Sequence, residues 1–246
     1  IGGFVLGWVD PDEPYFEYLF LAAYGGIPLP LEEGAYIGLF LVSLVPQIFL
    51  IFLLANYMLD DFTICSVYIF TRTNQRKTWL VRKCISLFFL AALYYILQFA
   101  VIFLLGQIAG GLTVSDTAAL LPIVLSELLF LVLLGFVYVL TVNLLSLKIG
   151  IHYAFLSVAL LIAGSGALAL VLKNSGALKF IPLSQAMLIW HDNETLVPYR
   201  GFIGDFIPGF TVLFSVLYLL ILLSALFALG MHWIEHLEIL WNERED

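Results

Sequence analysis

Residues 118–147, "AALLPIVLSELLFLVLLGFVYVLTVNLLSL", form an apolar run that contains a single charged residue, Glu127. A helix needs about 20 apolar residues to cross the roughly 30 Å hydrocarbon core of a bilayer, and this run exceeds that length. It therefore predicts a membrane-spanning helix. Four other runs meet the same criterion and predict further spans, at 35–58, 84–106, 149–172 and 207–231.

The composition of the whole chain supports the same interpretation. Its 246 residues are 63% hydrophobic and 11% charged, with a mean hydropathy of +1.06. Soluble domains carry about 25% charged residues, so we expect a single transmembrane domain over residues 1–246. The net charge of -8 argues against nucleic acid as a partner, because nucleic-acid binding needs a basic surface. Cys65 and Cys84 make neither a disulfide framework nor a set of zinc ligands.

The regions outside these runs complete the predicted topology. Residues 1–9, beginning "IGGFVLGW", look like the end of a first span that is largely missing, so we expect an all-α bundle of six membrane-spanning helices. The outer loop 10–34 combines acids with aromatic rings, which is typical of a short helix at the membrane interface. The outer loop 173–206 has apolar clusters bounded by Pro182 and Pro198, and it predicts short re-entrant helices before the last span.

The positive charges predict the orientation of the bundle. Lys and Arg in short loops stay on the cytoplasmic side. Placing the 59–83 loop and the 232–246 tail inside gives a multi-pass protein of the bacterial cytoplasmic membrane with both termini in the cytoplasm. This orientation puts seven of the ten Lys and Arg inside, namely Arg72, Arg76, Lys77, Arg82, Lys83, Lys148 and Arg244.

The loop 59–83, "LDDFTICSVYIFTRTNQRKTWLVRK", contains more than a topology signal. Asp60 or Asp61 is a suitable N-cap for a short amphipathic helix over 62–71, and residues 73–75 would end it and cap a second helix that rises into the bilayer. The positive charges alone are explained by topology and by anionic lipid. The amphipathic helix before them needs a surface to cover, either lipid or a groove on a cytoplasmic partner.

Residues 68–83, "YIFTRTNQRKTWLVRK", resemble the loop after the second span in permease subunits of ABC-2-type exporters. The similarity is greatest to small permeases of bacteriocin or antimicrobial-peptide systems. It covers the whole chain as architecture, and as a residue motif only this stretch. The resemblance implies that the loop holds a coupling helix seated in a groove of an ATPase subunit. The coupling residues that it implies are Asp61, Tyr68, Arg72, Arg76, Lys77 and Trp79.

The chain has no GxxxxGK[ST] sequence, so it does not bind ATP through a P-loop. We therefore expect a non-catalytic permease with no cofactor or metal of its own, with ATP and Mg on a separate cytoplasmic P-loop ATPase. The resemblance also implies a second permease, identical or a sister subunit, and contact with membrane lipids.

Two polar residues within the spans are candidates for a substrate path. Glu127 lies near the predicted middle of the membrane, and Gln98 reaches a comparable depth from the opposite leaflet. An acid at that depth marks either a functional site or a structural hydrogen bond between helices, and Gln98 is a possible partner for it. The sequence leaves these two alternatives open.

Other polar motifs favour ordinary explanations. "HWIEH", residues 232–236, lacks a third metal ligand, and "HDNE", residues 191–194, predicts a solvated loop tip. The predicted spans contain no cluster of acid, base and nucleophile, and this disfavours a membrane-embedded enzyme. The sequence thus predicts the permease of an ATP-driven exporter for a hydrophobic or amphipathic substrate, such as a peptide or lipid. The alternative is a non-transporting immunity or assembly factor.

Overall fold

The protein is helical throughout the part that the structure describes. The computed structural model describes residues 15–29, 33–61, 76–173 and 175–236. Within them, five helices are long and apolar enough to cross a membrane, and no strand is present beyond two isolated bridges. These helices are α3 (Glu33–Leu54), α5 (Arg76–Leu105), α6 (Thr117–Ile149), α7 (Ile151–Val171) and α9 (Val212–His236).

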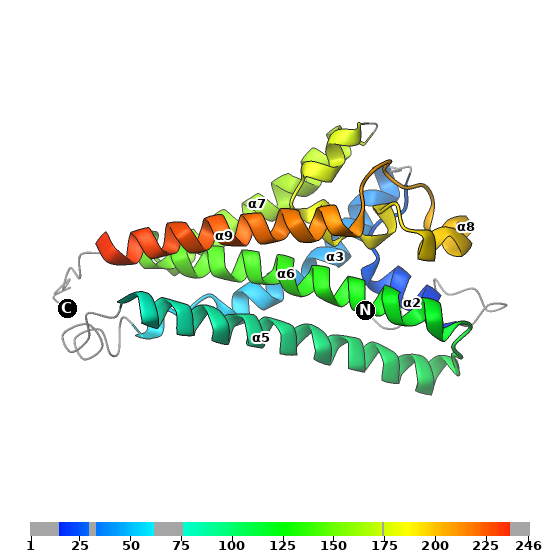
Figure 1. Cartoon of the computed structure of the whole chain (residues 1–246), viewed down its shortest axis with the longest axis horizontal. Coiled ribbons are helices and arrows are strands. Elements are labelled where there is room, and N and C mark those ends of the chain that lie inside the picture. Colours follow the sequence, from blue (N-terminus) through cyan, green and yellow to red (C-terminus); the bar gives the residue numbers. More distant parts are fainter. Residues whose placement is uncertain (1–14, 30–32, 62–75, 174, 237–246) are drawn as a thin grey trace.

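Helix α6 is the central helix of the bundle, and it contacts each of the other four long helices. Figure 1 shows it between α5 and α9. Of its most apolar stretch 72% is buried, whereas the corresponding value for α9 is 11%. The outward faces of α3, α5 and α9 expose large apolar side chains such as Phe52, Phe89 and Ile221. These properties are compatible with a multi-pass membrane protein, in which such faces contact lipid.

A buried amide supports an interruption of α3. This helix ends at Leu54, and a turn over 55–58 precedes a short helical continuation through Asp61. Asn143 of α6 accepts a hydrogen bond from the Met58 backbone N–H (2.9 Å) and donates one to the Leu54 carbonyl (2.8 Å). Backbone groups freed by a helix break are costly in an apolar environment unless a partner satisfies them. Asn143, which is fully buried, supplies that partner.

The end of the bundle where α6 begins carries several short elements. They include α2 (Phe16–Tyr24), the π-helical turn η1 (Gly106–Gly110) and a series of short turns. Asp116 caps α6 by accepting a hydrogen bond from the Ala118 N–H (2.8 Å). The series of short turns comprises η2 (Gly176–Phe180), η3 (Leu183–Ala186), η4 (Leu188–Trp190), η5 (Glu194–Tyr199) and α8 (Arg200–Ile203).

The observed helix boundaries differ from the expected spans at two places. Helix α5 begins at Arg76, directly after residues 73–75, so the second helix expected in the loop and the span expected over 84–106 form one continuous helix. Helix α9 begins at Val212 rather than 207, because Pro208 and Gly209, whose φ is +70°, form a turn just before it. The expected first span over 1–9 and the expected amphipathic helix over 62–71 lie outside the described residues.

Candidate functional site

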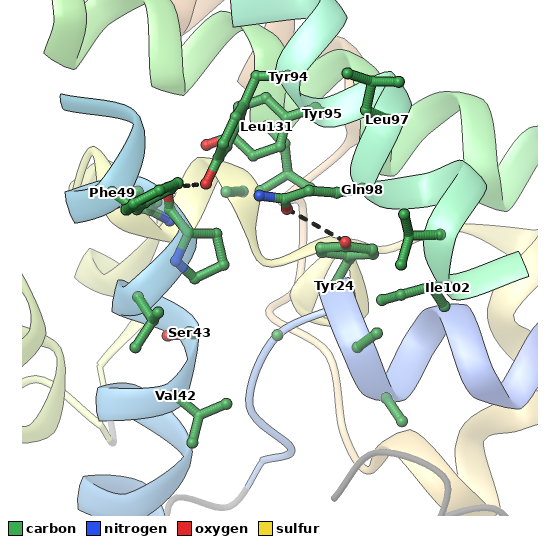
Figure 2. A pocket seen from close by; sticks show the side chains of 18 of the residues that line it. Tyr24, Val42, Ser43, Phe49, Tyr94, Tyr95, Leu97, Gln98, Ile102 and Leu131 are labelled. Carbon is green, nitrogen blue, oxygen red and sulfur yellow. Dashed lines mark hydrogen bonds between the residues drawn. The ribbon is translucent and has the colours of Figure 1, made fainter. Parts of the chain in front are cut away.

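A cavity of about 480 Å³ lies between α2, α3 and α5. Its floor includes Leu131 of α6 and Met187 from the series of short turns. Its lining is mostly aliphatic and aromatic, and no charged side chain belongs to it. Figure 2 shows lining side chains that come from α2, α3 and α5. Pockets that bind small molecules have this volume and this mixture of apolar walls with few polar groups.

The wall formed by α2 is fixed by backbone contacts with the series of short turns. After α2 the chain bends at Gly25 and Gly26, and the φ of Gly26 is +118°. The Gly25 carbonyl accepts a hydrogen bond from the Ile189 N–H (3.0 Å), and the Trp190 indole donates to the Ile27 carbonyl (2.6 Å). A Cβ at Gly26 would overlap Met187, so glycine is needed for this close approach.

Few polar groups line the cavity, and they come from three helices. The Tyr24 hydroxyl donates to Gln98 Oε1 (3.3 Å), and the two side chains face each other in Figure 2. Burial, with a smaller contribution from Glu127, raises the pKa of Tyr24, so its hydroxyl keeps its proton. The Tyr94 hydroxyl donates to the Pro46 carbonyl (2.8 Å). Gln47 is 4% exposed, and its Oε1 has no hydrogen-bond partner among the described residues.

The structure corrects the predicted hydrogen bond between Gln98 and Glu127. Glu127 is fully buried, and neither of its carboxyl oxygens has a hydrogen-bond partner in the described part of the chain. Gln98 accepts from Tyr24 instead, because α2 places that hydroxyl beside it. Gln98 lines the cavity and Glu127 does not. The two residues therefore do not form one polar pair, and a substrate path through Glu127 stays a prediction.

Four of the six predicted coupling residues lie at the end of the bundle where α5 begins, which we call the basic end: Asp61, Arg76, Lys77 and Trp79. Asp61 accepts a hydrogen bond from the Trp79 indole (2.9 Å) and forms an ion pair with Lys83 (2.8 Å). These contacts join the short helical continuation that follows α3 to the start of α5. Tyr68 and Arg72 lie outside the described residues.

The start of α5 is also joined to the end of α9. The Arg76 guanidinium donates to the carbonyls of Ile234 (3.3 Å) and Glu235 (3.5 Å), which lie in the last turn of α9. Lys77 forms an exposed ion pair with the Glu235 carboxylate (2.5 Å). A positive charge at the C-terminal end of a helix is favourable, because it meets carbonyls that lack a partner within the helix. Residues 62–75 are therefore flanked by residues that hold three helices together.

Comparison with known protein families identifies the family to which this chain belongs. A family model described as "Protein of unknown function (DUF2705)" matches residues 10–240. The chain belongs to this family. No curated protein and no solved structure matches the chain. The match covers the cavity and the basic end alike, so both belong to the part of the chain that the family model describes.

The end opposite the basic end contains a buried polar cluster in this family member. His191 is fully buried, with its ring stacked between Phe130 (4.9 Å between centroids) and Phe210 (4.0 Å). Its Nδ1 lies 3.0 Å from the Met187 carbonyl, and its Nε2 lies 2.6 Å from the Ser215 hydroxyl. The prediction of a solvated loop tip is therefore wrong for His191, although Asp192 and Glu194 are exposed.

Two partners complete this cluster. The Ser215 hydroxyl lies 2.8 Å from Gln185 Oε1, and Arg200 donates to the His191 carbonyl (2.7 Å). Burial lowers the pKa of His191 to about 4, against a smaller opposing effect of its backbone hydrogen bonds. Nδ1 faces the Met187 and Leu188 carbonyls, so it carries the proton of the neutral ring. Sequence reasoning missed this cluster because its members are far apart in the chain, and no local motif joins them.

The described residues contain no group of three or more His, Cys, Asp or Glu side chains placed to hold a metal ion. His232 and His236 of the "HWIEH" sequence lie side by side on α9, with ring centroids 4.6 Å apart and the rings tilted by 43°. Within the described residues, the cavity between α2, α3 and α5 offers room for a ligand.

Proposed function

We propose that this protein is the permease subunit of an ATP-driven exporter. It moves a hydrophobic or amphipathic substrate, a peptide or a lipid-like molecule, across the bacterial cytoplasmic membrane. The uncharged cavity between α3 and α5 is the observation that carries the proposal. A site for an ion or a sugar needs charges or many hydrogen-bonding groups, whereas this lining is suited to an apolar molecule with few polar groups.

The basic end supports a route for coupling ATP hydrolysis to the cavity. Asp61 and Arg76 flank residues 62–75, and both contact other helices at that end. Trp79 and Lys83, which bind Asp61, lie on α5, and the same helix carries Tyr94 and Gln98 in the cavity. An ATPase that docks on residues 62–75 would thus act on the helix that lines the substrate site. ATP and Mg belong to that ATPase, and a second permease completes the transporter.

The charge distribution supports a cytoplasmic location for the basic end. Five of the described Lys and Arg residues lie there, and three lie on the series of short turns or next to it. Positive residues are enriched on the cytoplasmic side of membrane proteins. We therefore assign α2 and the short turns to the outer side, where the short turns act as the re-entrant segment before the last span. The residues at the basic end are Arg76, Lys77, Arg82, Lys83 and Lys148.

Purification from the native membrane in mild detergent tests the proposal. We expect a P-loop ATPase to accompany the protein in fixed stoichiometry, with ATP hydrolysis in the purified complex. Arg72→Glu should weaken this association, and Lys173→Glu, which reverses a charge at the other end of the bundle, should not. Arg76 is unsuitable for the test because it also holds α9.

Two results would count against the proposal. The first is a purified protein that carries no ATP-hydrolysing subunit, which is the behaviour of an immunity or assembly factor. The second is an equal loss of the ATPase in the Arg72→Glu and Lys173→Glu variants, since it would remove the docking role of residues 62–75.

A further inference from the structure

The cavity opens on the lipid-facing side of the bundle. Lining residues on the outer faces of α3 and α5 are apolar and half exposed, as with Phe49 (51%), Leu97 (56%) and Val101 (53%). Deeper lining residues, such as Gln47 and Leu131, are almost completely buried. Because α3 and α5 are both candidate membrane spans, the rim of the cavity meets the hydrocarbon of the bilayer. A ligand therefore reaches this cavity sideways from the membrane rather than from water.

This route changes which side chains determine affinity. A molecule that leaves the bilayer for an apolar wall exchanges one hydrocarbon environment for another, so the apolar lining supplies little driving force. Polar groups in the cavity do discriminate between ligands, because a polar group that is left unpaired away from water is costly. Selectivity should therefore follow the hydrogen-bonding groups of the cavity.

Two polar side-chain groups of the lining lack a hydrogen-bond partner among the described residues, the Tyr95 hydroxyl and Gln47 Oε1, and both can accept a hydrogen bond. Pro46 has no backbone N–H, so the carbonyl of Val42, another lining residue, lacks the donor that the next turn of a helix normally provides. Ser43 adds no donor, because its hydroxyl is bonded to the Phe40 carbonyl of its own helix (2.8 Å). The cavity therefore favours a ligand that brings a donor.

We propose that the cavity binds an uncharged, lipid-like amphipathic molecule whose hydroxyl or amide group donates to the acceptors of α3 at Gln47 and Val42. The absence of charge from the lining disfavours phosphate and carboxylate head groups, which would lose their hydration without gaining a partner. The acyl chain occupies the apolar part of the cavity between α3 and α5. This inference rests on the proposed function, for which it names the substrate class.

Photolabelling of the purified protein in phosphatidylcholine vesicles, without an ATPase or nucleotide, tests the inference. The probe is monopalmitoylglycerol with a diazirine in its acyl chain. We expect labelled peptides from α3 and α5, and competition by unlabelled monopalmitoylglycerol. Methyl palmitate, which has the same chain and no donor, should compete roughly five- to tenfold less well, as expected for the loss of one buried hydrogen bond. The phosphate ester of monopalmitoylglycerol should compete no better than methyl palmitate.

Three variants make the test specific to the cavity. Val101→Trp fills the cavity and should abolish labelling, whereas Leu104→Trp on the same helix should not, since Leu104 is equally exposed (56%) but does not line the cavity. Gln47→Leu removes one acceptor. It should keep the labelling but reduce the preference for monopalmitoylglycerol over methyl palmitate.

The inference is overturned if Val101→Trp is labelled as strongly as the unchanged protein. It is also overturned if methyl palmitate or the phosphate ester competes as well as monopalmitoylglycerol, or if Gln47→Leu retains the full preference. These outcomes leave the proposed export function intact, because ATPase association is measured separately. Conversely, lipid binding without an ATPase partner would support the cavity and count against export.

Discussion

Replacing Asn143 with leucine tests whether one buried amide supports the interruption of α3. Leucine has a similar size and cannot form hydrogen bonds. The substitution leaves the Met58 N–H without its acceptor and removes one of two donors from the Leu54 carbonyl, which retains a longer contact with the Tyr57 N–H (3.3 Å). The third hydrogen bond of Asn143, to Val139 of its own helix, is local and contributes less.

The expected loss of stability follows from these contacts. An orphaned buried backbone group costs about 1–3 kcal/mol, and hydrogen bonds between membrane helices lie mostly at the low end of that range. We therefore expect Asn143→Leu to lower the free energy of unfolding by about 1–2 kcal/mol. For a chain of this size the midpoint of thermal unfolding should fall by about 2–8 °C.

Unfolding in mixed micelles, followed by circular dichroism, measures this loss. Hydrogen exchange at residues 55–61 should also become faster. Thr141→Val is the matched control, because its hydroxyl bonds only to the Val137 carbonyl of the same helix (2.7 Å). It should cost less than about 0.5 kcal/mol, as expected when no interhelical hydrogen bond is lost. A loss below about 0.5 kcal/mol for Asn143→Leu, or an equal loss for both variants, would refute the reasoning.

Three further substitutions test other parts of the bundle. The lowered pKa of His191, about 4 in the folded protein against 6.5 for the free side chain, predicts stability that is complete above pH 6.5 and falls as pH drops toward 4. His191→Gln should remove about 3 kcal/mol of that pH dependence, measured as the difference between the two unfolding profiles. Gly166→Ala should lower stability by about 1–3 kcal/mol, since the new methyl overlaps the buried ring of Phe40. Glu17→Gln should cost about 1 kcal/mol, because the buried carboxylate accepts backbone N–H groups before α6 (2.8 and 3.1 Å).

Each of these predictions has a result that contradicts it. An unchanged pH profile in His191→Gln would show that the ring is not held neutral by burial. Gly164→Ala is the control for Gly166→Ala, because its methyl meets nothing within 4 Å and should be neutral or stabilising. Equal effects at both glycines would refute the overlap with Phe40. A Glu17→Gln variant of full stability would show that the carboxylate charge does not support α6.

The long helices were predictable because the thickness of a bilayer sets their length. Apolar runs at 35–58, 84–106 and 118–147 correspond to α3, α5 and α6. Their exact boundaries were less predictable, since apolar character ends where the hydrocarbon ends and a helix need not. Helix α5 begins at Arg76, before its apolar run, and this start was predicted from the cap expected at residues 73–75 rather than from apolar character; its basic first turns contact α9 and Asp61.

The cavity was not predictable, because a sequence gives the depth of a residue along a helix but not the neighbour that it faces. Depth alone suggested that Gln98 meets Glu127. The structure places Tyr24 of α2 against Gln98, and Met187 completes the same wall. Both come from segments whose position depends on a glycine bend and on turn-to-turn hydrogen bonds. No periodic pattern in the sequence reports such contacts.

The arrangement of α5 gives the proposed function a physical basis. Its first turns bind Asp61 and the end of α9, and its later turns carry Tyr94 and Gln98 into the cavity. Under the proposed function, an ATPase at residues 62–75 and a ligand in the cavity act on this one helix. Coupling between two binding sites is reciprocal, so an ATPase that changes the affinity for the ligand is itself bound more or less tightly by the same factor. Under the proposed function, a substrate that enters from the membrane reports its presence to the ATPase through α5 and through α3, which lines the same cavity and continues to Asp61, without a charged relay across the bilayer.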